Sequence, residues 1–225
     1  MRVVSLVPSV TETLLAWDVE PVACTRFCEQ PELRHVGGTK DPDVDAVVGL
    51  APDVVVMNDD ENRREDFDAL VAAGLDVHVV RVCTVADVAP ELARLAERLG
   101  VPFERWSLPD PLPVERRAFV PIWRRPWMTV NADTYGASVL AQLGVGTVFA
   151  DAPERYPTVT LEEATARAPD VVLAPSEPYP FRERHVAELS TVAPVVLVDG
   201  QDLFWWGART PAALSRLAER LGPTG

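Results

Sequence analysis

The sequence predicts an α/β protein made of two Rossmann-like lobes of similar build. Short strand-like runs alternate with helical patterns along the chain, which is typical of a doubly wound sheet. The runs are apolar and β-branched at consecutive positions, as expected of parallel strands that helices cover on both faces. Segments of the first half also recur in the same order in the second half.

The alternation defines the elements that we expect in each half. In the first half the expected strands are 3–6, 22–24, 54–57 and 77–80, and the expected helices are 11–17, 43–50, 62–73 and 85–99. In the second half the expected strands are 119–122, 171–174 and 195–198, and the expected helices are 134–143, 161–167, 184–189 and 212–221. Each half thus has the elements of one lobe.

Two recurring segments support the division into lobes. Residues 94–100 read RLAERLG and return letter for letter at 216–222, and APDVVV at 51–56 returns as APDVVL at 168–173. The stretch between the halves is rich in proline, which favours a stiff, extended connector. We expect an N-terminal lobe at 1–103, a connector at 104–114 and a C-terminal lobe at 115–225.

The composition excludes several classes of partner. The 225 residues carry 21 Lys and Arg against 34 Asp and Glu, whereas nucleic acids and anionic membranes require a basic surface. No run approaches the roughly 18 apolar residues of a membrane span, so we expect neither nucleic-acid binding nor membrane insertion. A strand-like run begins at Val3 without a signal-peptide pattern. This predicts a cytoplasmic protein, or a periplasmic or cell-surface one if a leader was removed.

The sequence offers no motif for catalysis or for a resident metal. The cysteines are an odd set without metal-ribbon spacing or a disulfide framework: Cys24, Cys28 and Cys83. The acidic run 59–61 can be interpreted as a hard-cation site or as capping of the helix expected from Asn62, and capping is the simpler interpretation. A G-x-S-x-G nucleophile motif is missing, and the glycines at 144 and 146 follow a helix rather than a strand. We therefore predict a protein that is not an enzyme.

Candidate binding residues follow the expected strands, because open α/β sheets bind ligands at the carboxyl ends of their strands. Four of the six tryptophans fall in such segments of the second half: Trp123, Trp127, Trp205 and Trp206. They either seal a core edge or form an aromatic wall for a large, flat, partly apolar ligand in a cleft between the lobes. Arg124 and Arg209 beside them either pair with surface acids or meet anionic groups of that ligand.

Six segments, three in each half, resemble one family of binding proteins. In the first half they are VSLVPSVTE at 4–12, VGGTKDP at 36–42 and APDVV at 51–55. In the second half they are IWRRPWM at 122–128, RYP at 155–157 and SEPYPF at 176–181. Together they resemble the class III, or helical-backbone metal receptor, family of ABC-importer substrate-binding proteins for cobalamin and iron chelates. The resemblance implies a corrinoid, haem-like or siderophore ligand held between two lobes, with no covalently bound cofactor.

The resemblance implies binding residues in both lobes. The residues that we expect at the ligand are Ser9, Thr11, Arg26, Phe27, Asn58, Trp123, Arg124, Trp127, Glu177, Tyr179, Trp205, Trp206 and Arg209. The resemblance also implies an ABC permease as partner, which docks through a carboxylate on each lobe. Glu65 is the candidate carboxylate in the first lobe, whereas the tract Trp206–Ala208 offers no acid in the second.

The sequence thus predicts a non-enzymatic protein that binds a cobalamin-like corrinoid or another metal chelate. Two alternatives stay open at this point. One is a cytosolic enzyme that acts on a tetrapyrrole or a chelated metal, chelatase-like or corrinoid-processing, with His35 near Glu12 as the one combination to nominate. The other is a regulator that senses the ligand and binds a protein partner.

Overall fold

The computed structural model describes residues 1–222, which form two compact units. Unit 1 comprises Met1–Val82, Ala86–Ser107 and Trp206–Ala208. Unit 2 comprises Cys83–Val85, Leu108–Trp205 and the chain from Arg209 onward. The boundaries drawn from the sequence did not anticipate that a short segment of the second half, Trp206–Ala208, packs within unit 1.

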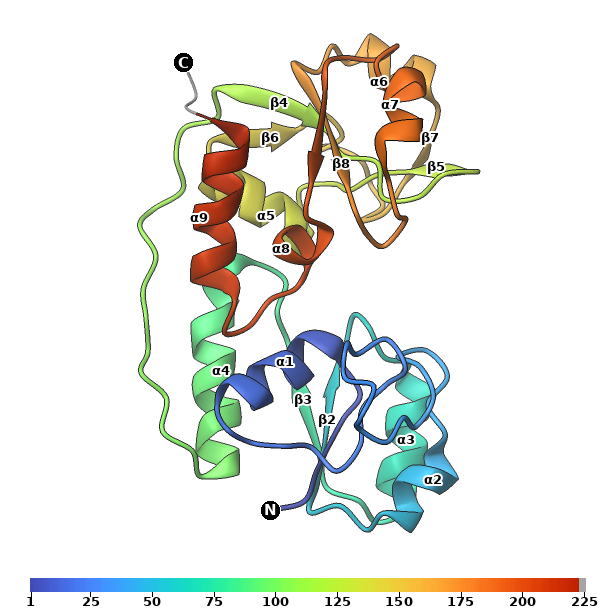
Figure 1. Ribbon diagram of the computed structural model, residues 1–225, viewed down its shortest axis with the longest axis vertical. Coiled ribbons are helices and arrows are strands. Elements are labelled where there is room, and N and C mark those ends of the chain that lie inside the picture. The colour runs from blue at the N-terminus through green and yellow to red at the C-terminus, as the bar shows by residue number, and fades with distance from the viewer. Residues whose placement is uncertain (223–225) are drawn as a thin grey trace. The chain divides into compact units, whose positions relative to one another are not determined.

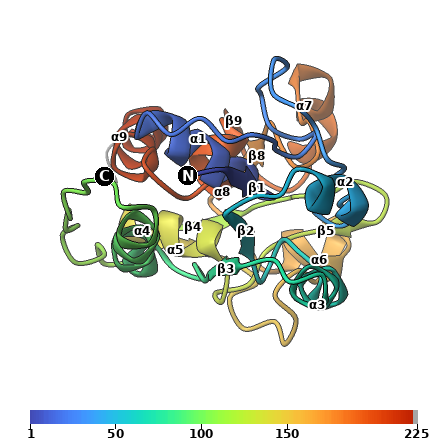
Figure 2. The same cartoon turned by 90° about the horizontal axis from the view of Figure 1, so that it is seen from below.

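Unit 1 is built on a parallel sheet of three strands in the order β1-β2-β3. The strands are β1 (Val3–Ser5), β2 (Val54–Asn58) and β3 (Val77–Val80). Every residue of β1 and β2 is buried, which explains why their sequences are apolar without alternation. The helices are α1 (Pro8–Ala16), α2 (Val44–Gly49), α3 (Arg64–Ala72) and α4 (Val85–Leu99). Helices α2 and α3 pack together beside the sheet (Figure 1, Figure 2).

Unit 2 is built on a parallel sheet of four strands in the order β6-β4-β8-β9. These strands are β4 (Arg116–Phe119), β6 (Val145–Thr147), β8 (Val171–Pro175) and β9 (Val195–Val198). A small antiparallel pair is formed by β5 (Trp127–Met128) and β7 (Thr158–Val159). The helices are α5 (Tyr135–Gln142), α6 (Leu161–Ala166), α7 (Glu183–Leu189), α8 (Gly200–Phe204) and α9 (Thr210–Leu221). Helix α5 lies against β6 (Figure 1).

These sheets confirm the predicted fold class, and the recurring segments form equivalent elements. APDVVV leads into β2 and APDVVL leads into β8, and each of these strands has a parallel neighbour on both sides. RLAERLG ends α4 in unit 1 and α9 in unit 2. Within residues 1–222, no helix combines the length and the apolar character needed to cross a bilayer.

Several predicted elements differ from the structure. The strand predicted at 22–24 is wrong, since Ala23 and Cys24 make only isolated bridges, to Val4 and His35. The strand predicted at 119–122 is displaced, because β4 begins at Arg116, whose charged side chain hid the start of the strand. Helix α1 begins three residues before the predicted start, with Pro8 in its first turn, where the missing N–H costs no hydrogen bond.

Candidate functional site

Aromatic side chains gather where β8 ends and along the segment that follows β4 in unit 2. We call Trp123, Trp127, Tyr179, Phe181 and His185 the aromatic cluster. The rings of Trp127 and Phe181 stack at 6.0 Å with an interplanar angle of 7°, and Trp123 meets Tyr179 edge-on at 5.7 Å. Tyr179 also lies 4.8 Å from Phe181 and 5.5 Å from His185. Offset and edge-to-face contacts of this kind stabilise aromatic pairs beyond their burial.

Two irregular segments hold the cluster in place. Trp123 bridges to Met128 across a tight turn that contains a cis Arg125–Pro126 bond, and Trp127 pairs with Val159 of β7. The segment after β8 contains a cis Glu177–Pro178 bond and folds back, so that the Phe181 amide donates to the Tyr179 carbonyl oxygen at 2.8 Å. The two segments are far apart in sequence, and the parallel pairing of β4 with β8 brings their ends together.

The cluster has a buried base and one exposed face. Phe181 and His185 are buried, Trp127 and Tyr179 are half-buried, and 44% of the Trp123 side chain is exposed. Burial and the neighbouring arginines hold the pKa of His185 below its ordinary value, so its ring is neutral near pH 7. The Nδ1 atom of His185 accepts the Arg182 amide at 3.0 Å, which fixes the ring under Tyr179 and Phe181. The exposed Trp123 indole therefore rests on a rigid support.

Arg124 is held against the aromatic cluster by contacts with Glu188 and Trp127. Its Nε donates to Glu188 of α7 at 2.9 Å, and its guanidinium lies 6.0 Å from the Trp127 ring centre. The hydrogen bond to Glu188 raises the pKa of Arg124 above its ordinary value, so the side chain keeps its charge. Of the two interpretations left open by the sequence, pairing with a surface acid is the one that the structure shows for Arg124.

Glu177 lies directly against the start of α8. A Cβ atom added at Gly200 would come within 2.5 Å of the Glu177 amide nitrogen, and the Gly200 amide donates to Ser176 Oγ at 2.9 Å. Glycine is therefore required where α8 begins. This close approach locks the segment that carries Tyr179 and Phe181 to the end of β9.

The consecutive tryptophans of the predicted site separate into different units. Trp205 is half-buried in unit 2, where the Arg209 guanidinium lies 5.4 Å from its ring centre. Arg209 also approaches the buried Asp202 at 3.5 Å, and Asp202 accepts two hydrogen bonds from Arg216. Trp206 is buried in unit 1, so it forms part of a core rather than an open aromatic wall.

In unit 1 three of the predicted binding residues are buried. Ser9 and Thr11 are buried on α1, and Thr11 Oγ1 donates to Ser5 Oγ at 2.8 Å. Asn58 is also buried, and its Oδ1 accepts the amides of Asp60 and Glu61 while its amide group donates to the Val80 carbonyl oxygen. Thr11 and Asn58 thus hold the ends of β1 and β2 in shape, whereas the buried Ser9 Oγ has no hydrogen-bond partner among the described residues.

The other two predicted residues of unit 1 are exposed. Phe27 is 53% exposed, and the Arg26 guanidinium lies 4.9 Å from its ring centre. Arg26 forms a bidentate pair with Asp41 at 2.9 and 3.0 Å. Phe27 is therefore the apolar surface that the structure presents among the predicted binding residues of unit 1.

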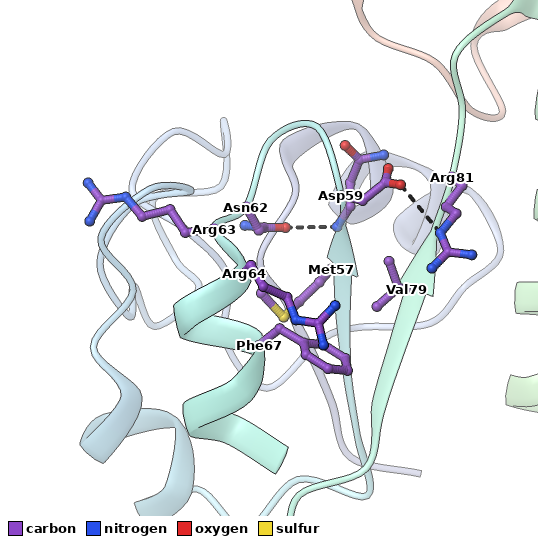
Figure 3. Close-up of a pocket in the computed structure, with 9 residues that line it drawn as sticks. Met57, Asp59, Asn62, Arg63, Arg64, Phe67, Val79 and Arg81 are labelled. Atoms are coloured by element: carbon purple, nitrogen blue, oxygen red, sulfur yellow. Dashed lines mark hydrogen bonds and ion pairs between the residues drawn. The ribbon is translucent and has the colours of Figure 1, made fainter. Parts of the chain in front are cut away.

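A pocket of about 120 Å³ lies in unit 1, between α3 and the strands β2 and β3 (Figure 3). Met57, Phe67 and Val79 form its apolar lining, while Arg81 pairs with Asp59 at 3.3 Å. The sequence interpretation expected the acidic run 59–61 to cap α3. Asp59 does not cap this helix, because α3 begins only at Arg64. Ligand pockets usually enclose some 300–1,000 Å³, so this one is too small for a tetrapyrrole ring.

Sequence reasoning missed two members of the aromatic cluster. Phe181 and His185 were not among the expected binding residues, although the spacing of Tyr179 and Phe181 is a visible signal of two aromatic side chains on one segment. His35 lies apart, with Nε2 at 3.1 Å from the Gln30 carbonyl oxygen. Across residues 1–222, the structure contains no group of three or more His, Cys, Asp or Glu side chains that could hold a metal ion.

Comparison with known proteins adds independent information. Residues 3–105 match the family model described as periplasmic binding protein. The vitamin B12-binding protein of Salmonella typhi is 25% identical over 189 residues, which cover 76% of this chain and 71% of that protein.

Solved structures extend the likeness along the chain. The periplasmic vitamin B12-binding protein BtuF of Vibrio cholerae has a TM-score of 0.76 at 18% identity, covering 98% of this chain and 96% of its own. The periplasmic heme-binding protein BhuT, in complex with two hemes, has a TM-score of 0.80 at 20% identity, covering 98% and 97%. At these identities the structures show that the fold is shared. The match to the family model shows that residues 3–105 are similar to periplasmic binding proteins, and the solved structures show that the likeness in fold covers nearly all of the chain.

Proposed function

We propose that this protein binds a flat, partly apolar metal chelate, with a corrinoid of the cobalamin type as the first candidate, and that it does not transform its ligand. The observation that carries the proposal is the exposed Trp123 indole on the rigid aromatic cluster of unit 2. A preformed apolar surface of this kind gains binding free energy from covering a ring face and loses little side-chain entropy. The cobalamin-type ligand is supported by the vitamin B12-binding protein of Salmonella typhi, which is 25% identical to this chain over 189 residues.

Haem is the second candidate ligand, because solved heme-binding proteins share the fold. The aromatic cluster offers the same kind of surface to a porphyrin face as to a corrin. The candidates separate by titration: the tryptophan fluorescence of the purified protein is followed as cyanocobalamin, haemin or a ferric siderophore is added. We expect saturable quenching by one of the three, and no quenching by any of them would contradict the proposal.

Trp123→Ala provides the residue-level test. Removing the exposed indole should weaken binding about tenfold, since covering one aromatic face contributes on the order of 1–2 kcal/mol. Leu112→Ala is the control, because Leu112 is an exposed apolar side chain like Trp123 but lies on the connector between the predicted lobes. Equal affinity of the Trp123→Ala variant and the parent protein for the ligand would show that the aromatic cluster does not contribute to ligand binding.

The partner and the compartment remain predictions from the sequence. An ABC permease is the partner that the resemblance to substrate-binding proteins suggests, and Glu65, exposed in the first turn of α3, is the carboxylate proposed to meet it. A pulldown with ligand-loaded and ligand-free protein separates a carrier from a regulator, which would bind its partner in only one state. Recovery of the added chelate unchanged after incubation with the protein would separate a carrier from a corrinoid-processing or chelatase-like enzyme.

A further inference from the structure

The pocket of unit 1 has an apolar floor made of side chains from regular elements (Figure 3). Met57 of β2 is buried, and Phe67 of α3 and Val79 of β3 are half-buried. Met57 and Val79 are direct partners in the parallel pairing of their strands, and Phe67 packs against the core cluster that contains Met57. The floor is therefore preformed, and covering it costs little side-chain entropy.

The volume of the pocket limits the size of the group that it can hold. It measures about 120 Å³. An apolar cavity of roughly 150 Å³ accommodates a benzene ring, so this pocket suits a somewhat smaller group, such as a branched chain of about four carbon atoms.

The rim of the pocket is basic, although the chain as a whole is acidic. The described residues that line it include Arg63, Arg64 and Arg81 but a single acid, Asp59, whereas acids outnumber basic residues 34 to 21 in the whole sequence. Figure 3 shows Arg64 in front of the floor and Arg81 beside Asp59, while the Arg63 side chain points away. The Arg64 guanidinium lies 5.2 Å from the ring centre of Phe67. Charge complementarity thus favours an anionic group at the mouth of the pocket.

Both guanidiniums at the mouth can exchange their present partners for a ligand. Arg81 Nε lies 3.3 Å from Asp59, and Arg64 Nε lies 2.9 Å from Asp68. These four side chains are between 47% and 81% exposed, and exposed ion pairs contribute little stability. The Arg81 backbone is held in place, because its amide donates to Glu91 Oε2 at 2.9 Å. A ligand carboxylate that accepts two parallel hydrogen bonds from a guanidinium would replace a weak pair by a stronger one.

We propose that this pocket binds a small branched monocarboxylate of the size of isovalerate. The branched aliphatic group lies on Met57, Phe67 and Val79, and the carboxylate at the mouth accepts hydrogen bonds from Arg81 and Arg64. All of these residues belong to unit 1, whereas the aromatic cluster belongs to unit 2. The monocarboxylate site is therefore additional to the proposed chelate site.

The test follows the methyl group in the floor by NMR. The full-length protein, labelled with methyl-¹³C methionine, is titrated with isovalerate at neutral pH. The sequence has three methionines, and the Met57→Leu variant identifies the Met57 signal. We expect a saturable shift of the Met57 signal, with the signal of Met128 in unit 2 unchanged. Isopentanol and isopentylamine carry the same branched chain without the carboxylate, and we expect each to bind about tenfold more weakly or less.

Arginine variants test the anchor of the carboxylate. Arg81→Gln and Arg64→Gln should each weaken isovalerate binding about tenfold, since each removes a charged donor at the mouth. Arg63→Gln is the matched control: it makes the same change of charge at a neighbouring position whose side chain points away from the floor (Figure 3). Its affinity for isovalerate should equal that of the parent protein.

Three results would overturn the proposal. One is a Met57 signal that does not move saturably with isovalerate. Another is binding of isopentanol or isopentylamine as tight as that of isovalerate, which would show that no carboxylate is recognised. The third is an equal loss of affinity in Arg63→Gln and Arg81→Gln, which would reduce the effect to overall charge. The titration uses no chelate, so its failure is distinct from a failure of the proposed chelate binding.

Discussion

The two units share a framework and differ in the chemistry at the carboxyl ends of their strands. In unit 1 the Arg2 amide donates to Asp53 and the Asp53 amide donates back to the Arg2 carbonyl oxygen, and Arg117 and Asp170 make the same pair of bonds in unit 2. Each APD segment begins with an alanine at positive φ, 45° for Ala51 and 49° for Ala168. The recurrence of such uncommon positions at matching places shows that the internal repeat is structural.

The strand ends diverge on this common framework. In unit 1 they carry buried polar groups, such as Thr11 and Asn58, that satisfy backbone and side-chain hydrogen bonds. In unit 2 they carry the aromatic cluster, whose Trp123 stays exposed. The two units thus repeat the backbone geometry at these positions, whereas the aromatic cluster belongs to unit 2.

The largest effect should come from the close approach at Gly200. Gly200→Ala would force a Cβ atom against the Glu177 backbone, so we expect a loss of about 3 kcal/mol and a melting temperature lower by roughly 5–10 °C. Gly49→Ala in α2 of unit 1 is the control, because nothing lies within 4 Å of its added Cβ atom. Thermal unfolding followed by circular dichroism measures both variants. Equal melting temperatures would show that unit 2 is not locked at this point.

The exposed aromatic side chains give the next largest effect. Trp123→Ala should weaken chelate binding about tenfold, whereas Phe27→Ala in unit 1 should weaken it less, since Phe27 lies against the Arg26 guanidinium and Trp123 rests on a preorganised aromatic cluster. Isothermal titration of both variants with the ligand that quenches the parent protein checks this order. A larger loss of chelate affinity in Phe27→Ala than in Trp123→Ala would contradict the proposal that unit 2 provides the main ligand-binding surface.

The shared anchor should give similar, smaller effects in both units. Asp53→Ala and Asp170→Ala each remove the acceptor of one backbone amide, so we expect each to cost about 1 kcal/mol in urea unfolding. Asp68→Ala, which breaks only the exposed pair with Arg64, should cost under about 0.5 kcal/mol. The structural equivalence of the repeats fails if only one of the two anchor variants loses stability.

The smallest effect concerns the response to pH. Burial lowers the pKa of His78 in unit 1 and of His185 in unit 2, so the unfolded chain binds protons more readily at both positions. The stability contributed by these neutral rings is complete above the ordinary histidine pKa of about 6.5 and is lost as pH falls toward the folded-state values. Melting temperatures of the parent protein and His78→Gln between pH 5 and about pH 8 test the sign. The variant should lose less stability on acidification, and a steeper loss would contradict the assignment.

Much of the framework was predictable, because long apolar runs and helical periodicity report burial directly. Helix α4 was predicted with its observed ends, and β3 likewise. The two-residue strands β5 and β7 were missed, since so short a pairing leaves no periodic signal. The candidate site was predicted less well. That Arg124 pairs with Glu188 and that Trp206 is buried depend on contacts between distant parts of the chain, which residue type alone does not reveal.

The most direct test of the account is equilibrium dialysis of the parent protein and Trp123→Ala against cyanocobalamin and, separately, haemin. The account predicts that one of the two accumulates with the parent protein to a saturating ratio and is retained about tenfold more weakly by Trp123→Ala, with Leu112→Ala unchanged. Retention of neither compound, or equal retention by the parent protein and Trp123→Ala, would contradict the claim that the aromatic cluster of unit 2 is the ligand-binding surface.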